Sequence, residues 1–515
     1  MARARAKHRQ DRQTPPADRR VPPRLVAALL ALAALAAYVN SLHGEFVFDD
    51  TALVQNNPQI RELGFAGLRR IFGSHYWQTV AGQGGLYRPM VMFSYAVNYA
   101  LSGPDPFAYH LVNVLLHAAN STLVWLIVVE LFGDRRFAFW SGLLFALHPI
   151  RTEAVAYVAG RAETLAAFFF LAAWWLYLKK RLAPAAAAFL LAVLSKESAF
   201  TFLAVLPISD HAARWKWERR TLARYLLFAG VAAAALGLRY LVLGGFAPLQ
   251  ITPSANPLAG ASAAVRLMTA THVFGKYLWL LIYPAALSAD YSYNQIELVN
   301  SPWEARFLVP ALALAALAAA TAWAFRRSLA PARPLFLCGA FLLATFSLTS
   351  NFLRPIGTIM AERLLYLPSL GFTCAVAYGL TALRRPRLAT ATGLLLAALY
   401  LARTSARNRD WKDHLSLFTS AAAVSPNSSL VQANLAGALL YARRDAAGAV
   451  EHARQAIRIE PLDPAAHMTL AEAHQLLGEW SRAAQAYARV EQLAPGTAGA
   501  VEAARRRQEV LRQVR

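Results

Sequence analysis

The chain has 515 residues, of which 57% are hydrophobic and 16% are charged, and its formal net charge is +23. This composition is too apolar for a soluble protein of that length, because several apolar runs approach the ~20 residues needed to cross a hydrocarbon core about 30 Å thick. A charge of this size would suggest nucleic-acid binding in a soluble protein, but here much of it falls in short segments between apolar runs, where Lys and Arg set membrane topology. The composition therefore favours a polytopic membrane protein with no nucleic-acid partner.

The expected elements begin with a basic arm at residues 1–24, which the charge rule places in the cytoplasm. About eleven apolar runs follow within residues 25–403, and the last of them ends on the outer side. An additional apolar stretch lies at 265–283. If it were a membrane-spanning helix, the resulting topology would disagree with the Lys and Arg of the later connections. We therefore interpret 244–304 as one outer loop with a helix that dips into the membrane. The eleven runs are 25–42, 106–132, 137–147, 165–178, 182–194, 199–208, 226–243, 306–325, 335–348, 364–383 and 389–401.

Residues 404–515 have a different pattern, which indicates tetratricopeptide repeats. Two units of about 35 residues begin at Asn434 and Thr469, and small residues such as Gly478 recur where the paired helices of such repeats approach each other. We expect a half-unit before them and a polar capping helix after them. The predicted fold class is therefore all-α: a polytopic membrane helix bundle followed by a carboxy-terminal tetratricopeptide-repeat α-solenoid.

Two adjacent carboxylates, Asp49 and Asp50, directly follow the first apolar run. The first helix would deliver them to the outer bilayer surface, where a lipid phosphate presents its head group. Adjacent carboxylates can divide their roles, one acting as general base and the other holding geometry or a cation. Two solvated acids at a helix end explain the pair equally well in isolation. The sequence does not distinguish which aspartate is the base.

Further polar clusters fall at predicted outer turns or between short apolar runs. Ionisable groups at membrane depth are costly and usually functional, and the planar fork of Arg suits a phosphate because it bonds two oxygens at once. The ordinary alternatives are a capped helix start, an internal ion pair and an interfacial Arg and Tyr belt. The candidates are Arg88 in the first outer loop, His148, Glu153, Arg161 and Glu163 in the second outer turn, Lys196 and Glu197 between two short runs, and Glu362, Arg363 and Tyr366 within one helical turn.

Metal and nucleotide chemistry have no signature in the sequence. His110 and His117 are seven residues apart, but no third ligand has the spacing of a metal site. A divalent metal is thus neither indicated nor excluded, and no cofactor is predicted. The phosphate-binding GxxxxGK[ST], the dinucleotide-binding GxGxxG and the hydrolase GxSxG patterns do not occur.

Several strings, taken in order, resemble the transmembrane and tetratricopeptide repeat-containing glycosyltransferases. They are FVFDD, NNPQI, YRP, YHLVNVLLHAAN, HPIRTEAVAYVAGRAE, LSKES, DYSYNQI and IGTIMAERLLYLPS, and they precede the repeats. The resemblance covers residues 40–495, nearly the whole chain. It implies a fold of the GT-C superfamily, whose members are multi-spanning, inverting transferases. Such an enzyme would take a sugar, mannose or another hexose, from a polyprenyl-phosphate carrier, as protein O-mannosyltransferases do.

The resemblance also implies roles for individual positions. Asp49-Asp50 corresponds to the acidic motif that supplies the general base, and Glu153 to a second acidic position. We expect Arg363, Lys196 and Arg161 to bind the donor phosphate. The residues expected to support the pocket are His148, Glu163, Glu197, Glu362, Tyr366 and Arg88.

The expected partners are a lipid-linked sugar donor and a hydroxyl acceptor, a protein Ser or Thr or a glycan, which the repeats would help to select. An Ala-rich chain with more Arg than Lys looks bacterial, so we expect the plasma (inner) membrane, with the amino terminus cytoplasmic and the active site and repeats outside. Two rivals differ in class: a non-catalytic scaffold that recruits periplasmic partners through its repeats, and a carrier that flips lipids or polysaccharides. A scaffold needs one anchor helix, and a carrier would place charges along both halves of the membrane path.

Overall fold

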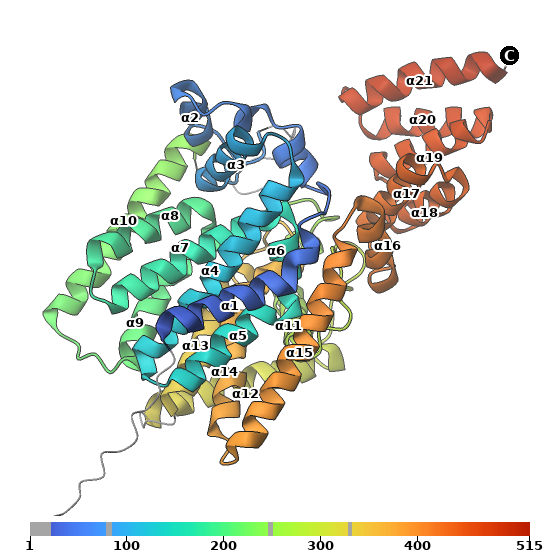
Figure 1. Ribbon diagram of the computed structural model, residues 1–515. Coiled ribbons are helices and arrows are strands. Elements are labelled where there is room, and N and C mark those ends of the chain that lie inside the picture. Colours follow the sequence, from blue (N-terminus) through green and yellow to red (C-terminus); the bar gives the residue numbers. More distant parts are fainter. Residues whose placement is uncertain (1–21, 79–84, 246–250, 328–331, 515) are drawn as a thin grey trace, which may run out of the picture.

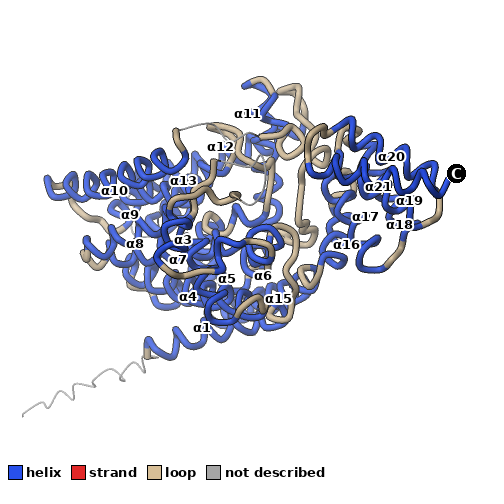
Figure 2. The backbone as a smooth tube through the Cα atoms, turned by 90° about the horizontal axis from the view of Figure 1, so that it is seen from above, coloured by secondary structure: helices blue, strands red, loops and turns tan. Residues whose placement is uncertain are grey.

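The computed structural model describes residues 22–78, 85–245, 251–327 and 332–514, and within these ranges every regular element is helical (Figures 1 and 2). The predicted all-α class is therefore confirmed. Most of the basic arm predicted at 1–24 lies outside the described residues.

Each of the eleven predicted apolar runs corresponds to a helix of the main bundle. Six described helices are long and apolar enough to cross a membrane, or seven if the pair bent by 102° between Ala156 and Val158 counts as one span. The other runs form shorter helices. An integral membrane protein is thus confirmed. The helices are α1 Pro23–Tyr38, α4 Pro106–Phe132, α5 Arg135–Leu147, α7 Arg161–Leu178, α8 Leu182–Ser195, α9 Phe202–Ala212, α10 Arg219–Leu243, α12 Ala305–Arg327, α13 Ala332–Phe346, α14 Ser369–Ala382 and α15 Pro386–Asp410.

Burial separates the helices at the centre of the bundle from those at its rim. In α4, 56% of the most apolar 18-residue stretch is buried inside the protein, whereas only 17% and 11% of the corresponding stretches of α10 and α12 are buried. A helix that is hydrophobic on all sides but covered by protein on few of them must face lipid. Helices α10 and α12 therefore form part of the lipid-facing surface.

Further helices belong to the connections at the end of the bundle that carries the repeats. They include α2 Phe65–Phe72, α3 Pro89–Ser102, α6 Thr152–Ala156 and α11 Ala263–Ile282. The apolar stretch predicted to dip into the membrane corresponds to α11, which is not among the six helices that meet the criteria for a span. Figure 2 shows the loops of this region gathered between the bundle and the repeat helices.

Six helices form the carboxy-terminal solenoid, which projects from one end of the bundle (Figure 1). Each packs against the next, as the predicted repeats require. Helix α15 runs without a break through the expected boundary at 403–404 to Asp410. The turn after α19 uses Gly478 at φ +74°, whereas the turn after α17 places Arg444 at φ +57°. The solenoid helices are α16 His414–Val424, α17 Ser429–Arg443, α18 Ala446–Ile459, α19 Pro464–Leu476, α20 Trp480–Leu493 and α21 Ala498–Val514.

Candidate active site

A cavity of about 1210 Å³ lies where the connecting loops meet. Segments from the first outer loop, the α6–α7 turn, the α8–α9 turn, α10 and the loops around 290 and 355 contribute to its lining. Apolar side chains from α10 and the 348–353 segment form one part of the wall. The charged residues that line it are Asp49, Arg88, Lys196, Glu197, Arg239, Asp290, Arg354 and Arg363.

The structure gives the adjacent aspartates different environments. Asp50 is fully buried, and its carboxylate accepts hydrogen bonds from the backbone N–H groups of Val47 (3.1 Å) and Ala159 (2.7 Å). Asp49 instead lines the cavity. Phe48, which directly precedes the two aspartates, has a left-handed backbone at φ +54°, a costly conformation for a bulky residue. Asp50 therefore holds two loops together, and of the two aspartates only Asp49 lines the cavity.

The surroundings of Asp49 favour a group that accepts a proton. Its backbone N–H donates to the Tyr157 hydroxyl at 2.9 Å, and that hydroxyl also hydrogen-bonds the carboxylate. Burial raises the pKa of Asp49, while Arg363 and Tyr157 oppose this rise and the negative charges of Glu153 and Asp290 add to it. A carboxylate with a raised pKa is a better general base than an ordinary one.

Glu153, on α6, holds Arg363 in place. One carboxylate oxygen of Glu153 accepts the backbone N–H of Arg363 at 2.7 Å, and the other forms an ion pair with its guanidinium. Glu153 is fully buried and does not line the cavity, so its position gives it no contact with a substrate there. The guanidinium of Arg363 lines the cavity, and its remaining N–H donors have no partner among the described residues.

The charges at the α8–α9 turn are paired. Lys196 forms an ion pair with Glu163, which lies behind the cavity wall. Glu197 accepts from Arg88 at 2.9 Å and from Arg239 at 3.1 Å. Burial alone would raise the pKa of Glu197, but these two arginines lower it to about 2. Of the predicted residues, Lys196, Glu197 and Arg88 therefore meet Asp49 and Arg363 around one cavity.

Arg161 is placed elsewhere. It is fully buried, and its guanidinium donates to Asn113 Oδ1 (2.5 Å), Asn98 Oδ1 (2.8 Å) and the Tyr109 carbonyl (2.7 Å). It does not line the cavity. With its donors used to join α3, α4 and α7, Arg161 is not positioned to bind a donor phosphate, and the phosphate-binding role expected from its outer-turn position is not supported.

Three other predicted pocket residues are also buried away from the cavity. Each makes hydrogen bonds that join separate elements and leaves no group at the lining. His148 Nε2 bonds the Leu281 carbonyl (2.9 Å), Glu362 accepts from the Ser288 N–H (2.6 Å) and the Tyr291 hydroxyl (2.8 Å), and the Tyr366 hydroxyl bonds His117 Nδ1 (2.8 Å) and Asn120 Nδ2 (2.9 Å). These residues support the architecture around the site.

The cavity also contains Arg239 and Asp290, which were absent from the predicted set. Arg239 is the only charge in α10 after Arg224, within an otherwise apolar stretch, a signal that the sequence offered. Asp290 belongs to the DYSYNQI string but was given no role there. Arg354 lines the cavity and makes no hydrogen bond or ion pair to the parts of the chain that the structure describes.

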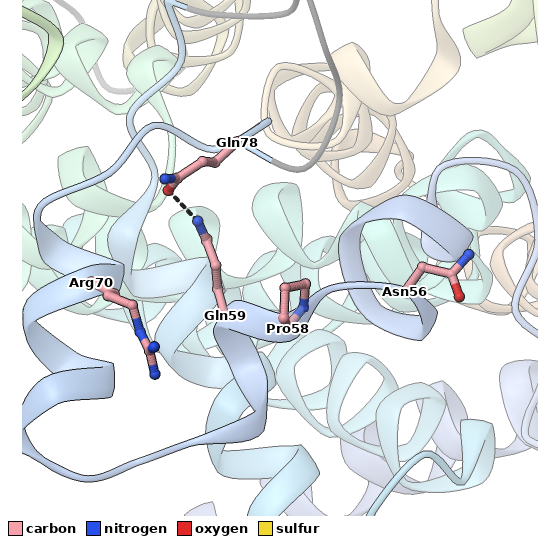
Figure 3. Close-up of a pocket in the computed structure, with 5 residues that line it drawn as sticks. All are labelled: Asn56, Pro58, Gln59, Arg70 and Gln78. Atoms are coloured by element: carbon pink, nitrogen blue, oxygen red, sulfur yellow. Dashed lines mark hydrogen bonds between the residues drawn. The ribbon is translucent and has the colours of Figure 1, made fainter. Parts of the chain in front are cut away.

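A second, smaller cavity of about 510 Å³ lies beside the first and is lined by Asn56, Pro58, Gln59, Arg70 and Gln78 (Figure 3). The side-chain amides of Gln59 and Gln78 hydrogen-bond across it. Asn56 contributes to both cavities. No carboxylate lines the smaller cavity, whereas Asp49, Glu197 and Asp290 line the larger one. Across the described ranges, no group of three or more His, Cys, Asp or Glu side chains has the arrangement of a metal site.

Comparison with known proteins adds to this picture. The sequence model of the family described as "Protein O-mannosyl-transferase TMTC, DUF1736" matches residues 245–318, the segment that carries Asp290. The chain is 28% identical to the Protein O-mannosyl-transferase Tmtc3 of Drosophila melanogaster over 90% of this chain and 58% of that protein. It is 28% identical to human Protein O-mannosyl-transferase TMTC3 over 89% of this chain and 54% of that protein.

Human Protein O-mannosyl-transferase TMTC1 is 30% identical over 84% of this chain and 55% of its own length. These matches confirm the resemblance found in the sequence strings. The chain spans little more than half the length of the curated relatives it matches.

Proposed function

We propose that this relative of the TMTC protein O-mannosyl-transferases is a membrane glycosyltransferase that moves a sugar, mannose or another hexose, from a polyprenyl-phosphate carrier to a hydroxyl of an extracytoplasmic protein. The observation that carries the proposal is one cavity in which Asp49 and the unsatisfied donors of Arg363 face the same space. A base and a phosphate-binding cation are the two groups that such a transfer requires. The names of the relatives support the acceptor class.

The apolar wall of the cavity supports a lipid-linked donor. Leu236 and Leu243 of α10, together with Leu348 and Leu353, line this wall, and α10 is one of the helices that face lipid. An isoprenoid chain can therefore lie against the wall while its phosphate reaches the charged part of the cavity. We place this part, and the solenoid, on the outer side of the membrane, because the Lys and Arg of the connections favour a cytoplasmic amino terminus.

The transfer needs one displacement at the anomeric carbon. Asp49 takes the proton of the acceptor hydroxyl as the oxygen attacks, the new carbon–oxygen bond forms, and the bond from the anomeric carbon to the phosphate oxygen breaks. The electron pair of that bond leaves with the phosphate, and the anomeric configuration inverts. A positioned general base contributes about 10²–10⁴-fold to such a step.

Arg363 stabilises the charge that develops on the leaving phosphate. Arg363 lines a cavity with a partly apolar wall, where such electrostatic help is stronger than in bulk solvent. Glu153 holds Arg363 through one contact to its guanidinium and one to its backbone N–H, so little reorganisation is needed when the charge appears. Arg354 is the second cation with free donors, and Lys196 contributes its charge despite its pairing with Glu163.

The test is a transfer assay with purified protein in lipid. A panel of radiolabelled polyprenyl-phosphate sugars is combined with Ser- and Thr-containing peptides, and product is scored with and without the protein. Labelled peptide that is formed by the wild type and lost in a folded Arg363→Ala variant supports the proposal; Arg482→Ala, an exposed arginine of the solenoid, is the control outside the cavity. Absence of both transfer and saturable donor binding contradicts it and leaves the scaffold as the better explanation.

A further inference from the structure

The helix pair α16–α17 is joined to the loops that carry the cavity carboxylates. Val47 and Tyr157, on two of these loops, share one buried apolar cluster with Trp411, Phe418 and other residues at the start of the solenoid. Leu430 of α17 lines the cavity itself. We refer to this contact, between residues 411–431 and the loops around 47, 157 and 290, as the solenoid seam.

On one side, the seam holds the loop of Asp49. His414 Nε2 accepts the backbone N–H of Phe48 at 3.0 Å. The Trp411 ring stacks on Tyr157 with centroids 5.0 Å apart and planes inclined by 30°. Tyr157 in turn bonds Asp49. Residues that precede and begin the solenoid therefore fix the position of the proposed base.

On the other side, the seam holds Asp290. Ser428, the residue that caps α17, donates its hydroxyl to Asp290 Oδ2 at 2.8 Å. The backbone N–H and the hydroxyl of Ser292 donate to the same oxygen, at 2.7 and 2.5 Å. No described residue donates to Oδ1, although Asp290 lines the cavity. One carboxylate oxygen is thus anchored from the solenoid, and the other is left for a ligand.

The chemistry of the free oxygen restricts that ligand. A carboxylate oxygen accepts a hydrogen bond, and it repels a phosphate. The arginines that suit a phosphate occupy other parts of the wall. The group that fits Asp290 is therefore a hydrogen-bond donor and not the phosphate; in the proposed reaction it is a hydroxyl of the transferred sugar or an N–H or hydroxyl of the acceptor.

We propose that Asp290 contacts the substrate as a second cavity carboxylate and that Ser428 is its positioning residue, so that α16–α17 form part of the active site. This inference rests on the proposed function for the identity of the substrate. The arrangement differs from a tethered recruitment module, because the solenoid supplies a hydrogen bond to a group that lines the reaction cavity.

Four variants test the inference. Asp290→Asn keeps an amide oxygen for the serine hydroxyls and places an NH₂ group where the free oxygen was. Ser428→Ala removes the anchor, and Ser428→Thr keeps a hydroxyl for both Asp290 and the α17 cap. Ser425→Ala is the matched control: its hydroxyl is equally buried in the seam and donates at 2.9 Å to the Ser288 hydroxyl, which contacts the backbone of Asp290 but not its carboxylate.

We expect Asp290→Asn and Ser428→Ala each to lower kcat/KM for transfer about 10-fold per folded molecule, a change of about 1.4 kcal/mol. Ser428→Thr should recover most of the rate. Ser425→Ala should lower it much less than Ser428→Ala, because every hydrogen bond to the Asp290 carboxylate remains. Because Ser428 acts through Asp290, the double variant should be no slower than Asp290→Asn alone. Separate KM values for donor and peptide show which substrate supplies the hydrogen-bond donor.

A Ser428→Ala variant that transfers as well as Ser425→Ala overturns the inference. The inference is also overturned if the loss of kcat/KM in the double variant equals the product of the losses in Asp290→Asn and Ser428→Ala. If the wild type transfers nothing, the proposed function fails first. The seam is then tested by thermal unfolding of the same full-length variants: additive losses for Asp290→Asn and Ser428→Ala refute the coupling, and non-additive losses support it.

Discussion

Exchange of each aspartate of the first outer loop for asparagine separates chemistry from structure. Asp49→Asn removes the proposed base and touches no other element through its carboxylate except the Tyr157 hydroxyl. We expect a loss of about 10²–10⁴-fold in kcat, the range that a positioned base contributes. Stability and donor binding should stay close to those of the wild type, because the amide still accepts a hydrogen bond.

Asp50→Asn should have the opposite pattern. The two carboxylate oxygens of Asp50 accept hydrogen bonds from the backbone N–H groups of Val47 and Ala159. Asparagine offers only one oxygen and turns an NH₂ group towards the second N–H. One hydrogen bond is lost and one buried N–H is left unpaired, which costs about 1–3 kcal/mol. We therefore expect less folded protein and a lower thermal midpoint, while the transfer rate per folded molecule falls much less than in Asp49→Asn.

The assay combines radiolabelled transfer to peptide with thermal unfolding of the detergent-purified protein, both normalised to the folded fraction. The assignment of the two roles is refuted if Asp50→Asn abolishes transfer at full stability while Asp49→Asn turns over normally. Equal and complete loss in both, with wild-type unfolding curves, would mean that the pair acts as a unit.

Three further outcomes follow from the same structure. Burial raises the pKa of Asp49, and the proposed base works only when it is ionised. We therefore expect kcat/KM to have its maximal value above this pKa and to fall as the pH drops through it. A pH–rate profile with its acidic limb at the ordinary value of 3.8 contradicts this. Arg354→Ala should raise the donor KM about 10-fold without a change in the unfolding midpoint, since Arg354 has no partner among the described residues; an unchanged KM in a donor titration removes it from phosphate binding. Arg444→Gly should stabilise the solenoid by about 0.5 kcal/mol and Gly478→Ala should destabilise it by about 1 kcal/mol, because both positions are left-handed; denaturant midpoints that move in the reverse directions refute the reasoning.

The sequence predicted the helices well because their signals are local. Apolar runs, charged connections and the repeat spacing depend on neighbouring residues only. The same locality explains why Asp49 and Asp50 were recognised as a pair but not distinguished. Their difference depends on the left-handed backbone of Phe48 and on a donor from Ala159, more than a hundred residues away.

Individual site residues were harder to predict for the same reason. Arg161 and Arg363 both precede an apolar run and lie near an acidic residue. Nothing local shows that the first is surrounded by side chains of α3 and α4 while the second lines a cavity. The long-range contacts that decide this have no trace in a single sequence. Arg239 is the exception, since a lone charge within an apolar helix is visible without a structure.

The solenoid seam has a consequence for how such chains can be recombined. A chimera joined at residues 403–404 would cut within α15 and replace the helix pair that holds Asp290 and Phe48. The turn at Arg444 and Asp445 lies beyond these contacts, and from there each helix packs mainly on its neighbours. Repeats can therefore be exchanged after this turn while the contacts that the solenoid makes with Asp290 and Phe48 are kept.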